Sequence, residues 1–379
     1  MRILFLDQSG NLGGAELCLL DLAKFYGNSG LVAVFADGTF PQALNREGIP
    51  VTVLGGKPLQ IRKDSNFWQS AGNIGQIIAL ILQVVKISRD RDLIYANTQK
   101  ALVIGAIASL ITRKPLVYHL HDILSLEHFS PVNRKIAVFM ANSFAALVIA
   151  NSEASKSAFI DAGGNTILVK VVYNGFDLAK YQTAPEQVAN LRQELNLKAK
   201  YIVGHFSRLS PWKGQHILLK ALAQCPETTA ILVGDALFGE EEYVRELHQL
   251  VKQLELSDRV LFLGFRDDIP QLMSLCDLIT HTSTAAEPLG RVIIEGMLAG
   301  KPVIATAAGG AVELIDQGNT GWLTTPGDVT ELAQTITQCQ QQPEITKAVA
   351  IAGQKSAQAR FDQAKILQQI DLLLKPLVE

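Results

Sequence analysis

The chain has 379 residues, of which 48% are hydrophobic and 18% are charged, and its formal net charge is −2. A chain of this length predicts two domains, each with enough apolar residues to bury a core. The small net charge argues against a nucleic-acid-binding protein, since such proteins usually carry a basic excess.

The cysteines indicate a reducing compartment, and the apolar segments predict neither a signal peptide nor a membrane span. The four cysteines lie far apart with no C-x-x-C pair, and we expect them to be buried thiols. The N-terminal sequence MRILFLDQSG has one basic residue and a short apolar run, which predicts a first strand rather than a signal peptide. The longest apolar stretches, Ile77–Val85 and Ala101–Ile111, fall short of the roughly 20 residues that span a bilayer. We therefore expect a cytoplasmic protein.

Short apolar strands alternate with helical patterns along both halves of the chain. This alternation predicts parallel βαβ units, and hence two doubly wound, Rossmann-like domains. In the first half we expect strands at Ile3–Leu6, Val32–Phe35, Val51–Leu54, Leu93–Ala96, Leu116–Leu120, Ala146–Ala150 and Ile167–Val172, with helices from Ala15 and over Ile74–Ser88, Ala101–Thr112 and Val132–Phe144. In the second half we expect strands at Tyr201–Phe206, Thr229–Val233, Val260–Phe262, Leu278–His281 and Val303–Ala305, with helices between them.

The predicted domain boundary lies near the middle of the chain. The turn Tyr173–Asp177 ends the first half, and a polar helix follows around Glu186–Leu195. A last helical pattern runs from Lys355 to Leu373. We therefore expect an N-terminal domain over residues 1–178, a linker over 179–198, a second domain over 199–354 and a C-terminal helix over 355–379.

A glycine-rich turn, Ser9–Glu16, joins the first predicted strand to the first predicted helix. Gly13 and Gly14 would let the backbone approach a phosphate closely, with the helix N-terminus facing the anion. The spacing is not G-x-G-x-x-G, and a tight strand-to-helix connection explains the same glycines equally well.

Two basic residues follow the first strand of the second half, in the segment Gly204–Gly214. Ligands of open α/β sheets bind beyond the carboxyl ends of the strands, so this loop lies at the expected edge. Arg208 can hold two phosphate oxygens as a fork, and Lys213 adds a mobile positive charge. A solvated loop is the alternative interpretation.

The segment Tyr118-His119-Leu120-His121-Asp122 ends another predicted strand. Alternation along the strand places both histidines on one side. A metal pair completed by Asp122 is conceivable, but we favour a neutral imidazole that hydrogen-bonds a substrate hydroxyl, and we predict no metal site. For one of the two histidines, the serious alternative is a structural role, as a buried core residue whose ring nitrogens are hydrogen-bonded within the protein.

The triplet Asp90-Arg91-Asp92 has the D-x-D pattern of the metal–diphosphate site in one large class of sugar transferases. Here it stands between a helix that ends at Ser88 and a strand that begins at Leu93. That position is the amino end of the strand, whereas ligands bind at the carboxyl end. We therefore interpret the triplet as a charged turn.

The most specific pattern is the run Glu287-Pro-Leu-Gly-Arg-Val-Ile-Ile-Glu295, which is followed by Ala308-Gly309-Gly310. Pro288 suits the first position of a helix, because its φ is fixed and it lacks an N–H. Glu295 would then lie about two turns along, roughly 10–12 Å away, with the positive end of the helix between the two carboxylates. A nucleoside diphosphate sugar has that layout of sugar, diphosphate and ribose. Two surface glutamates at a helix start are the alternative.

Taken together, these motifs resemble the retaining glycosyltransferases of family four, which have the two-domain GT-B fold. The resemblance covers nearly the whole chain and extends to Val148–Ser152, Tyr173–Asp177, Leu263–Phe265 and Glu313. It implies two Rossmann-like domains facing each other across a cleft, with the C-terminal helix packing back towards the first. The sequence departs from the family at Leu289, where Phe is common, and at Arg291, where an apolar residue is frequent. These departures weaken inferences about the donor but not about the reaction.

The resemblance also implies a role for each motif. Arg208 and Lys213 would neutralise the leaving diphosphate, while Glu287 would lie near the donor sugar and His121 would contact it. The ribose would bind Glu295, the base would meet the backbone of residues 264–266, and Gly13–Gly14 would close on the phosphates from the other domain. The predicted catalytic residues are Arg208, Lys213, Glu287 and His121. The predicted donor-binding residues are Gly13, Gly14, Gly264, Phe265, Arg266, Leu289, Gly290, Arg291 and Glu295.

The expected reaction is sugar transfer from a nucleoside diphosphate sugar, without a metal or another cofactor. Since no carboxylate is obviously placed as a nucleophile, we favour front-face attack, in which the leaving diphosphate accepts the proton of the acceptor. We also expect Lys213→Ala to lower kcat with little unfolding, and Glu295→Ala mainly to raise the KM for the donor. The alternatives are a nucleotide-sugar epimerase, a pyridoxal-phosphate-dependent phosphorylase and a donor-binding regulatory protein without turnover.

The acceptor, a glycan, lipid-linked or small molecule, is expected to bind the first domain. Basic and aromatic residues mix in Lys57–Ser70 and in Asn133–Phe144, and either segment could rest on a membrane that bears the acceptor. An ordinary loop and an ordinary helix are the alternatives. We expect a role in polysaccharide or glycolipid biosynthesis, with peripheral contact at the inner face of the membrane and no nucleic-acid partner.

Overall fold

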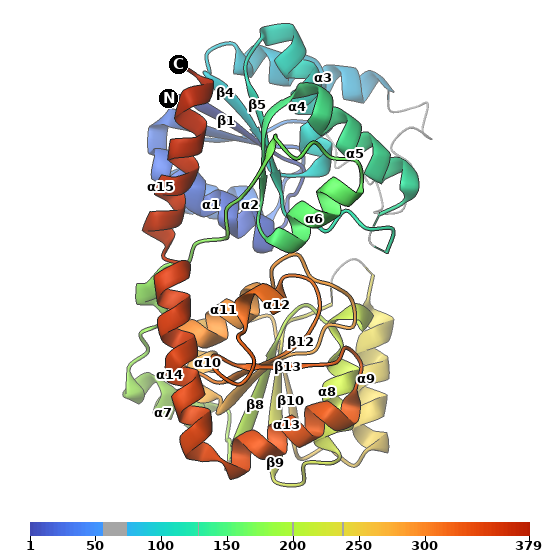
Figure 1. The fold of residues 1–379 in the computed structure, drawn as a ribbon, viewed down its shortest axis with the longest axis vertical. Helices are drawn as coiled ribbons and strands as arrows, with labels where there is room; N and C mark the ends of the chain where they lie inside the picture. The colour runs from blue at the N-terminus through green and yellow to red at the C-terminus, as the bar shows by residue number, and fades with distance from the viewer. Residues whose placement is uncertain (56–73, 128, 199–200, 237–238) are drawn as a thin grey trace. The chain divides into compact units, whose positions relative to one another are not determined.

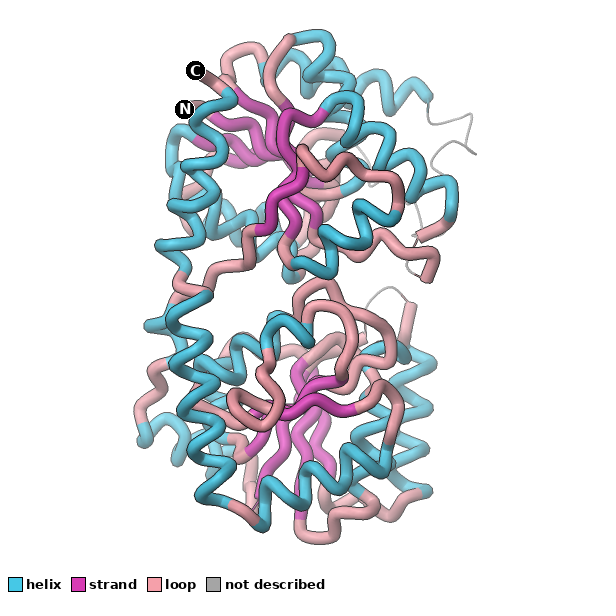
Figure 2. The backbone as a smooth tube through the Cα atoms, viewed as in Figure 1, coloured by secondary structure: helices cyan, strands magenta, loops and turns pink. Residues whose placement is uncertain are grey.

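The computed structural model describes residues 1–55, 74–127, 129–198, 201–236 and 239–379. The chain divides into two compact units. Unit 1 comprises Met1–Gly175 together with Ala364–Glu379, and unit 2 comprises Phe176–Gln363. In each unit, helices lie on both sides of a sheet (Figure 1, Figure 2). The predicted segment Lys57–Ser70 lies outside the described residues.

The described residues of unit 1 form a seven-stranded parallel sheet in the order β3-β2-β1-β4-β5-β6-β7. The order reverses between β1 and β4, and that pair of strands marks the switch point of the sheet. The strands are β1 (Ile3–Asp7), β2 (Gly30–Val34), β3 (Val51–Val53), β4 (Leu93–Ala96), β5 (Leu116–Leu120), β6 (Ala145–Ala150) and β7 (Val169–Val171). The helices are α1 (Gly14–Tyr26), α2 (Thr39–Arg46), α3 (Ile74–Ser88), α4 (Gln99–Thr112), α5 (Pro131–Phe144), α6 (Glu153–Asp161) and, from the C-terminus, α15 (Gln363–Leu374).

Both faces of this sheet are buried, which explains why its strands are apolar throughout rather than alternating. Leu4 and Leu6 of β1 belong to one core cluster with residues of α3 and α4, whereas Ile3 and Phe5 belong to a second cluster with residues of α1 and α15. Strands covered by helices on both faces read as continuous apolar runs. This is the reason that the strand predictions in the first half were close.

The described residues of unit 2 form a six-stranded parallel sheet in the order β10-β9-β8-β11-β12-β13, with its switch point between β8 and β11. The strands are β8 (Tyr201–Phe206), β9 (Thr228–Val233), β10 (Val260–Gly264), β11 (Leu278–His281), β12 (Val303–Thr306) and β13 (Trp322–Thr324). The helices are α7 (Pro185–Glu194), α8 (Gln215–Leu222), α9 (Glu241–Gln253), α10 (Ile269–Leu275), α11 (Arg291–Leu298), α12 (Ala311–Leu314), α13 (Val329–Gln341) and α14 (Pro343–Arg360). Strand β13 was not predicted from the sequence.

The C-terminal helical pattern predicted over Lys355–Leu373 is two helices, and the single helix is a wrong prediction. Phe361, at 0% exposure, ends α14 in unit 2, and its carbonyl accepts a hydrogen bond from the Phe176 N–H at 2.8 Å. The Phe176 carbonyl in turn accepts from the Gln363 N–H at 3.1 Å. From Ala364 onward the chain belongs to unit 1, where Ile370 of α15 joins the core beside α1. The break arises because the buried ring and the paired backbone of Phe361 remove it from the helix.

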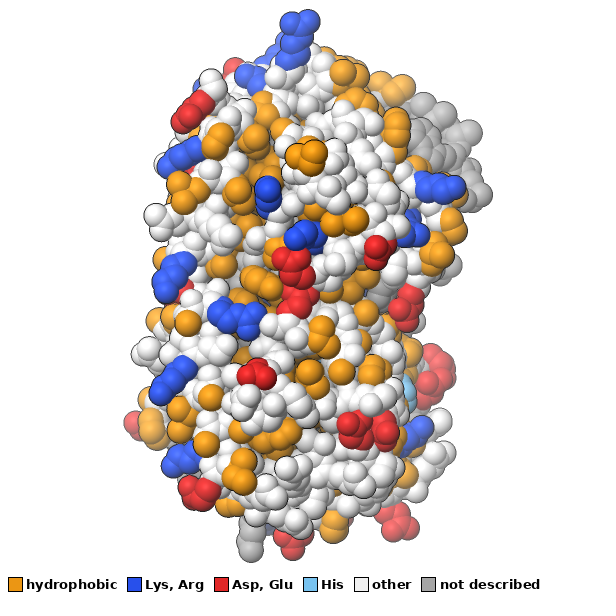
Figure 3. All heavy atoms as spheres, in the orientation of Figure 1, with side chains coloured by type: hydrophobic (Ala, Val, Ile, Leu, Met, Phe, Trp, Pro, Cys, Tyr) orange, Lys and Arg blue, Asp and Glu red, His pale blue; other side chains and the backbone are white. Residues whose placement is uncertain are grey.

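The surface agrees with the charge balance of the sequence. On the face drawn in Figure 3, basic and acidic side chains are interspersed.

The triplet Asp90–Asp92 forms the turn between α3 and β4, and Asp92 accepts a hydrogen bond from the Arg2 backbone at 2.7 Å. Its interpretation as a charged turn is therefore confirmed. Among the described helices, none is both long and apolar enough to cross a bilayer.

Candidate active site

The loops at the switch point of unit 2 bring Lys213 and Glu287 together. Lys213 follows β8 and Glu287 follows β11, and these strands are parallel neighbours whose carboxyl ends share one edge of the sheet. Gly214, with a φ of +72°, lies directly after Lys213, and a Cβ there would stand 1.9 Å from the Thr282 carbonyl oxygen. Only glycine therefore allows the β8 loop to lie against the β11 loop.

Glu287 is a buried carboxylate surrounded by donors. Its Oε1 lies 2.6 Å from Lys213 Nζ and 2.8 Å from His281 Nε2, and the Ser283 hydroxyl donates to the same oxygen. Burial raises the pKa of Glu287, but the charges and hydrogen bonds of Lys213 and His281 outweigh it, so that the pKa lies well below its usual range. The carboxylate is therefore ionised and holds the ammonium group of Lys213 at the switch point.

The loop that carries Glu287 packs backbone to backbone on the two glycines that follow β12. The Gly310 N–H donates to the Glu287 carbonyl at 2.8 Å. A Cβ at Gly309 would stand 2.2 Å from that carbonyl oxygen, and one at Gly310 would stand 2.5 Å from the Pro288 oxygen. The Gly-Gly pair noted in the sequence thus fixes the position of Glu287 by permitting this close approach.

The prediction that Pro288 starts the helix is wrong. Gly290, with a φ of +82°, precedes α11, which begins at Arg291. The left-handed turn arises because the chain buries Leu289, at 2% exposure, before it enters the helix. Glu295 therefore lies about one turn into α11 rather than two.

Glu295 and Arg291 form a pair on the first turn of α11. Arg291 Nη2 lies 3.4 Å from Glu295 Oε1, and the guanidinium also stacks 4.5 Å from the centre of the Phe176 ring. Both side chains are about one-fifth exposed. The roles of Leu289, Gly290, Arg291 and Glu295 in donor binding stay predictions.

Arg208 has a carboxylate partner of its own. Its Nε lies 3.2 Å from Glu240 Oε2, and the Ser210 hydroxyl donates to the other oxygen of that carboxylate. The two basic residues predicted from one loop are thus held by two different carboxylates, Glu240 for Arg208 and Glu287 for Lys213. Glu240 precedes α9 in a segment without any recognisable motif, so nothing in the sequence could have indicated it.

The residues predicted to meet the base lie at the end of β10 and directly after it. Gly264 has a φ of +64°, and its carbonyl accepts from the Gly234 N–H at 2.8 Å. The next side chain, Phe265, is 78% exposed. Arg266 pairs with Asp268 at 2.6 Å and with Glu194 at 3.4 Å. The Arg266 side chain is therefore held within unit 2, and contact with a base stays a prediction for this segment.

The switch point of unit 1 carries a hydrogen-bonded chain from a carboxyl group to an imidazole. Asp7 ends β1 and Asn97 directly follows β4. The Asn97 amide NH₂ donates to Asp7 Oδ2 at 2.7 Å and to the Ala15 carbonyl at 3.3 Å, and Asn97 Oδ1 lies 2.8 Å from His121 Nε2. Since the amide group is fixed by its two acceptors, Nε2 of His121 must donate to Oδ1. His121 therefore carries a proton on Nε2, and the lone pair of the neutral ring lies on Nδ1.

A second buried carboxyl group, Glu16, lies under the glycine-rich turn. A Cβ at Gly13 would stand 2.8 Å from Glu16 Oε2, and Gly14 begins α1. Burial raises the pKa of Asp7 to about 6, while burial and the neighbouring Asp7 raise the pKa of Glu16 to about 8. Gly13 thus makes room for a carboxyl group of the protein, and the predicted contact of Gly13–Gly14 with phosphate stays a prediction.

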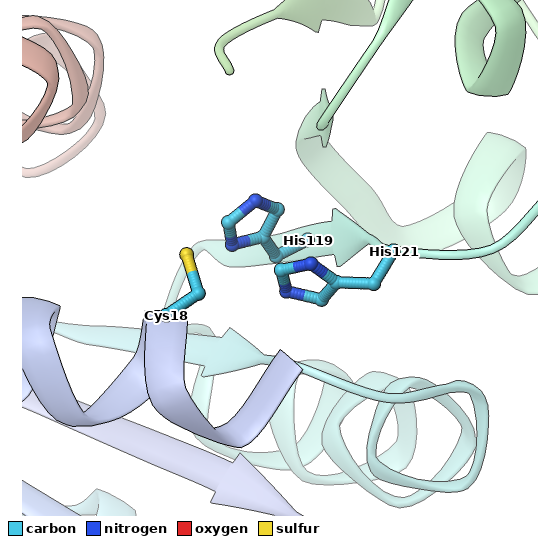
Figure 4. Close-up of side chains that lie close together, drawn as sticks. All are labelled: Cys18, His119 and His121. Carbon is cyan, nitrogen blue, oxygen red and sulfur yellow. The ribbon is translucent and has the colours of Figure 1, made fainter. Parts of the chain in front are cut away.

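The two histidines of β5 lie side by side, as alternation predicted. Their ring centres are 3.8 Å apart, and the Tyr95 hydroxyl lies 2.7 Å from His119 Nδ1. Burial and the neighbouring His121 hold the pKa of His119 well below its usual value, so this ring is neutral. The third metal-ligating group near them is the thiol of Cys18 from α1, and not the Asp122 carboxylate considered from the sequence (Figure 4).

Comparison with known proteins identifies the family. Residues 12–180 match the family model described as Glycosyltransferase Family 4, and residues 187–356 match the one described as Glycosyl transferases group 1. Two curated relatives match over part of their length. The spore coat protein SA of Bacillus subtilis is 38% identical over 171 residues, 41% of this chain and 44% of that protein. The N-acetyl-alpha-D-glucosaminyl L-malate synthase of Bacillus anthracis is 31% identical over 209 residues, which are 54% of this chain and 53% of that protein. The chain thus spans about half the length of the curated relatives it matches.

Solved structures match over the full length. The crystal structure of Anabaena HepE in complex with UDP-glucose is 57% identical, with a TM-score of 0.93 over 99% of this chain and 100% of that one. Sucrose-phosphate synthase from Thermosynechococcus elongatus, at 20% identity, shares the fold with a TM-score of 0.84 over 100% of this chain and 99% of its own. Two parallel α/β units of this kind define the GT-B fold, so the predicted fold class is confirmed. The chain belongs to the glycosyltransferases of family four.

Proposed function

We propose that the protein is a retaining, metal-independent glycosyltransferase that uses a nucleoside diphosphate sugar, with UDP-glucose as the first donor to test. The observation that carries the proposal is the Lys213–Glu287 pair at the switch point of unit 2, at 2.6 Å. In open α/β sheets, ligands bind at this point. HepE, which is 57% identical, has been crystallised with UDP, with UDP and glucose, and with UDP-glucose, which supports the choice of donor.

The charges of unit 2 suit the departure of a diphosphate. Breaking the bond between the sugar C1 and the phosphate oxygen leaves negative charge on the diphosphate, and preorganised cations stabilise that charge in the transition state. Lys213 and Arg208 are such cations, since each is held by a buried or half-buried carboxylate before a ligand arrives. The protein's own cations thus take the part that a divalent metal plays in other transferases.

The same carboxylate is poorly suited to act as a nucleophile. Oε1 of Glu287 accepts hydrogen bonds from Lys213, His281 and Ser283, and its low pKa makes it a weak base. In the proposed reaction the acceptor oxygen attacks C1 on the face that the diphosphate leaves, and the acceptor proton passes to a phosphate oxygen. A new C1–oxygen bond replaces the old one on the same face, and the anomeric configuration is retained.

The proposal is tested by incubating the chain with a panel of nucleotide sugars. The true donor should raise the Tm through binding linkage. Since hydrolysis by water replaces an unknown acceptor, the first anomer released from UDP-glucose can be observed by proton NMR before it equilibrates. We expect α-glucose, released at the same rate with and without EDTA. β-Glucose, or loss of activity with EDTA, would contradict the proposed mechanism, and an isomerised donor would indicate an epimerase.

A matched pair of variants tests the role of the cations. Arg208 and Arg245 both belong to unit 2 and both pair with a glutamate, but Arg245 lies on the exposed face of α9. Arg208→Ala should lower kcat about a hundredfold or more, the usual cost of removing one stabilising group at a developing charge. Arg245→Ala should leave kcat unchanged. Equal kcat values for the two variants would contradict a role for Arg208 in catalysis.

We further propose that helix α5 of unit 1 rests on an anionic membrane surface and presents the enzyme to a lipid-linked acceptor in polysaccharide or glycolipid biosynthesis. Val132, Lys135 and Phe139 are three and four residues apart and share one helix face. Val132 is 52% and Phe139 61% exposed, and the adjacent helix α4 exposes Leu110 at its end. Apolar groups that enter the lipid beside a cation that meets its headgroups are typical of peripheral membrane helices.

Co-sedimentation with vesicles tests this contact. Vesicles with anionic lipid should bind the chain at low salt and release part of it at high salt, whereas purely zwitterionic vesicles should bind less. Phe139→Ser should weaken binding several-fold. The control is Phe25→Ser, which removes a 46% exposed apolar residue from α1, the helix that packs on the opposite face of the sheet from α5. Equal binding of both variants would contradict the membrane contact and leave the transfer reaction untouched.

A further inference from the structure

We propose that Cys18, His119 and His121 in unit 1 form a binding site for a zinc-class divalent ion. The Cys18 thiol and one ring nitrogen of each histidine lie within 4.8 Å of one another. Figure 4 shows the Cys18 side chain rising from α1 towards the two rings, which lie at the end of β5 and directly after it. The ion would be an inhibitory ligand and not a cofactor of the transfer reaction.

The topology of unit 1 explains why these residues meet. Val117 of β5 belongs to the core cluster that contains residues of α1, whereas Tyr118 belongs to the cluster on the opposite face. Alternation therefore places His119 and His121 on the face that α1 covers. Cys18 lies on α1 between core residues and is 8% exposed, so it reaches the rings from the covering helix.

Two hydrogen bonds orient the rings as outer-shell partners do in metal sites. The Tyr95 hydroxyl contacts Nδ1 of His119, and Asn97 Oδ1 accepts from Nε2 of His121. For His119, the other nitrogen, Nε2, has no hydrogen-bond partner among the described residues, although the residue is only 2% exposed. A buried polar atom without a partner is costly, and a metal ion would satisfy it. For His121 the argument from Asn97 places the lone pair on Nδ1, which is the form that binds a metal.

The chemistry of the donors selects the ion. One thiol and two imidazoles suit zinc and its neighbours among the transition metals, whereas magnesium and calcium prefer oxygen ligands. Zinc bonds of about 2.0–2.3 Å need the three atoms somewhat closer than 4.8 Å, which side-chain rotation can supply. On binding, the Cys18 thiol releases its proton to solvent and the sulfur forms the metal bond. Three protein ligands leave a fourth position for water, as in open zinc sites.

The site is tested by titrating the full chain with Co²⁺, a spectroscopic substitute for Zn²⁺, under reducing conditions. We expect one equivalent to bind with visible bands of tetrahedral cobalt and a near-ultraviolet sulfur-to-cobalt band, and Zn²⁺ but not Mg²⁺ to abolish both. Cys18→Ser should lose the sulfur band. Cys225→Ser, which replaces another buried thiol in unit 2, should keep it. A wild-type chain without the sulfur band, or a Cys18→Ser variant that retains it, would overturn the proposal.

A further variant separates ligation from packing. Tyr95→Phe keeps the ring but removes the hydroxyl that orients His119, and it should weaken Co²⁺ binding about tenfold to a hundredfold. If Cys18→Ser fails to fold, this variant and the Zn²⁺ competition in the wild-type chain still decide the outcome. Should the proposed function hold, with His121 at the donor sugar, Zn²⁺ should also inhibit transfer by the wild-type chain and not by Cys18→Ser. The cobalt spectrum requires no donor and no turnover, so failure of the proposed function would not affect it.

Discussion

The switch points of the two units have the same topology, but they shift the pKa values of their buried carboxyl groups in opposite directions. Each switch point lies between the strands that come first and fourth along the chain of its unit, and each buries carboxyl groups near histidines. In unit 2, Glu287 faces Lys213 and His281, and its pKa lies well below its usual range. In unit 1, Asp7 accepts from the neutral amide of Asn97, and its pKa is raised to about 6.

Burial cannot explain this difference, because Glu287 is 7% exposed and Asp7 and Glu16 are 0% and 9% exposed. The decisive factor is whether a cation lies within hydrogen-bond distance, since an opposite charge favours the ionised form and burial alone opposes it. Unit 2 therefore presents fixed charges, which suit a diphosphate. Unit 1 instead presents the Asn97 amide and carboxyl groups whose protonated form is favoured by burial, and these hydrogen-bonding groups suit hydroxyl groups. The contrast can be tested by removing the cation from one site and the carboxyl group from the other.

The largest effect is expected from Lys213→Ala. The variant should lose kcat at least a hundredfold, but the buried ion pair replaces the sequence-based expectation of little unfolding with a loss of stability. Since Glu287 would remain buried without its main partner, the variant should also lose about 3–5 kcal/mol of stability. The measurements are steady-state kinetics and chemical denaturation. The double variant Lys213→Met/Glu287→Gln is the control, because it should regain stability without regaining activity. Wild-type stability of Lys213→Ala would show that the pair is not coupled.

A smaller effect is expected when Glu16 becomes glutamine. The fold raises the pKa of Glu16 from 4.5 to about 8, so the protonated form is favoured and its contribution to stability is lost as the pH rises through this range. Since one pKa unit corresponds to about 1.4 kcal/mol, Glu16→Gln should be more stable than wild type by on the order of 1–3 kcal/mol above this range, and similar to it below. Thermal unfolding across pH measures the difference. The exposed Glu153→Gln in the same unit is the control, and an equal pH dependence of both variants would contradict a buried neutral Glu16.

The smallest effect concerns Glu295, the carboxylate on the first turn of α11. It is partly exposed, and its contact with Arg291 is loose at 3.4 Å. If Glu295 binds the ribose of the donor, Glu295→Gln should raise the KM for the donor about tenfold, equivalent to about 1.4 kcal/mol, with little change in kcat or stability. Arg291→Ala, which removes only its partner, is the comparison. A lower kcat at unchanged KM would instead place Glu295 in the chemical step.

Much of the fold could be predicted because its signals are local. The strands of both sheets are continuous apolar runs, and β4, β5, β8 and β11 have the bounds predicted from them. The C-terminal segment could not be predicted in this way. Its helical pattern continues through Phe361, and only the contact with the distant Phe176 interrupts it. The predicted start of α11 was wrong for a similar reason, since burial of Leu289 outweighed the preference of Pro288 for a first helical position.

The sequence by itself determined the family, the two parallel sheets and the edge of each sheet at which the candidate site residues gather. Strand patterns and strand-end motifs are properties of short segments, and the order of the motifs along the chain distinguishes the family. Only the tertiary structure decided which side chains are neighbours in the candidate sites. Lys213 and Glu287 are 74 positions apart, and Cys18 meets the β5 histidines only because α1 covers that face of the sheet. A carboxyl group or an imidazole takes its charge state from such neighbours, and the folded chain brings them within hydrogen-bond distance.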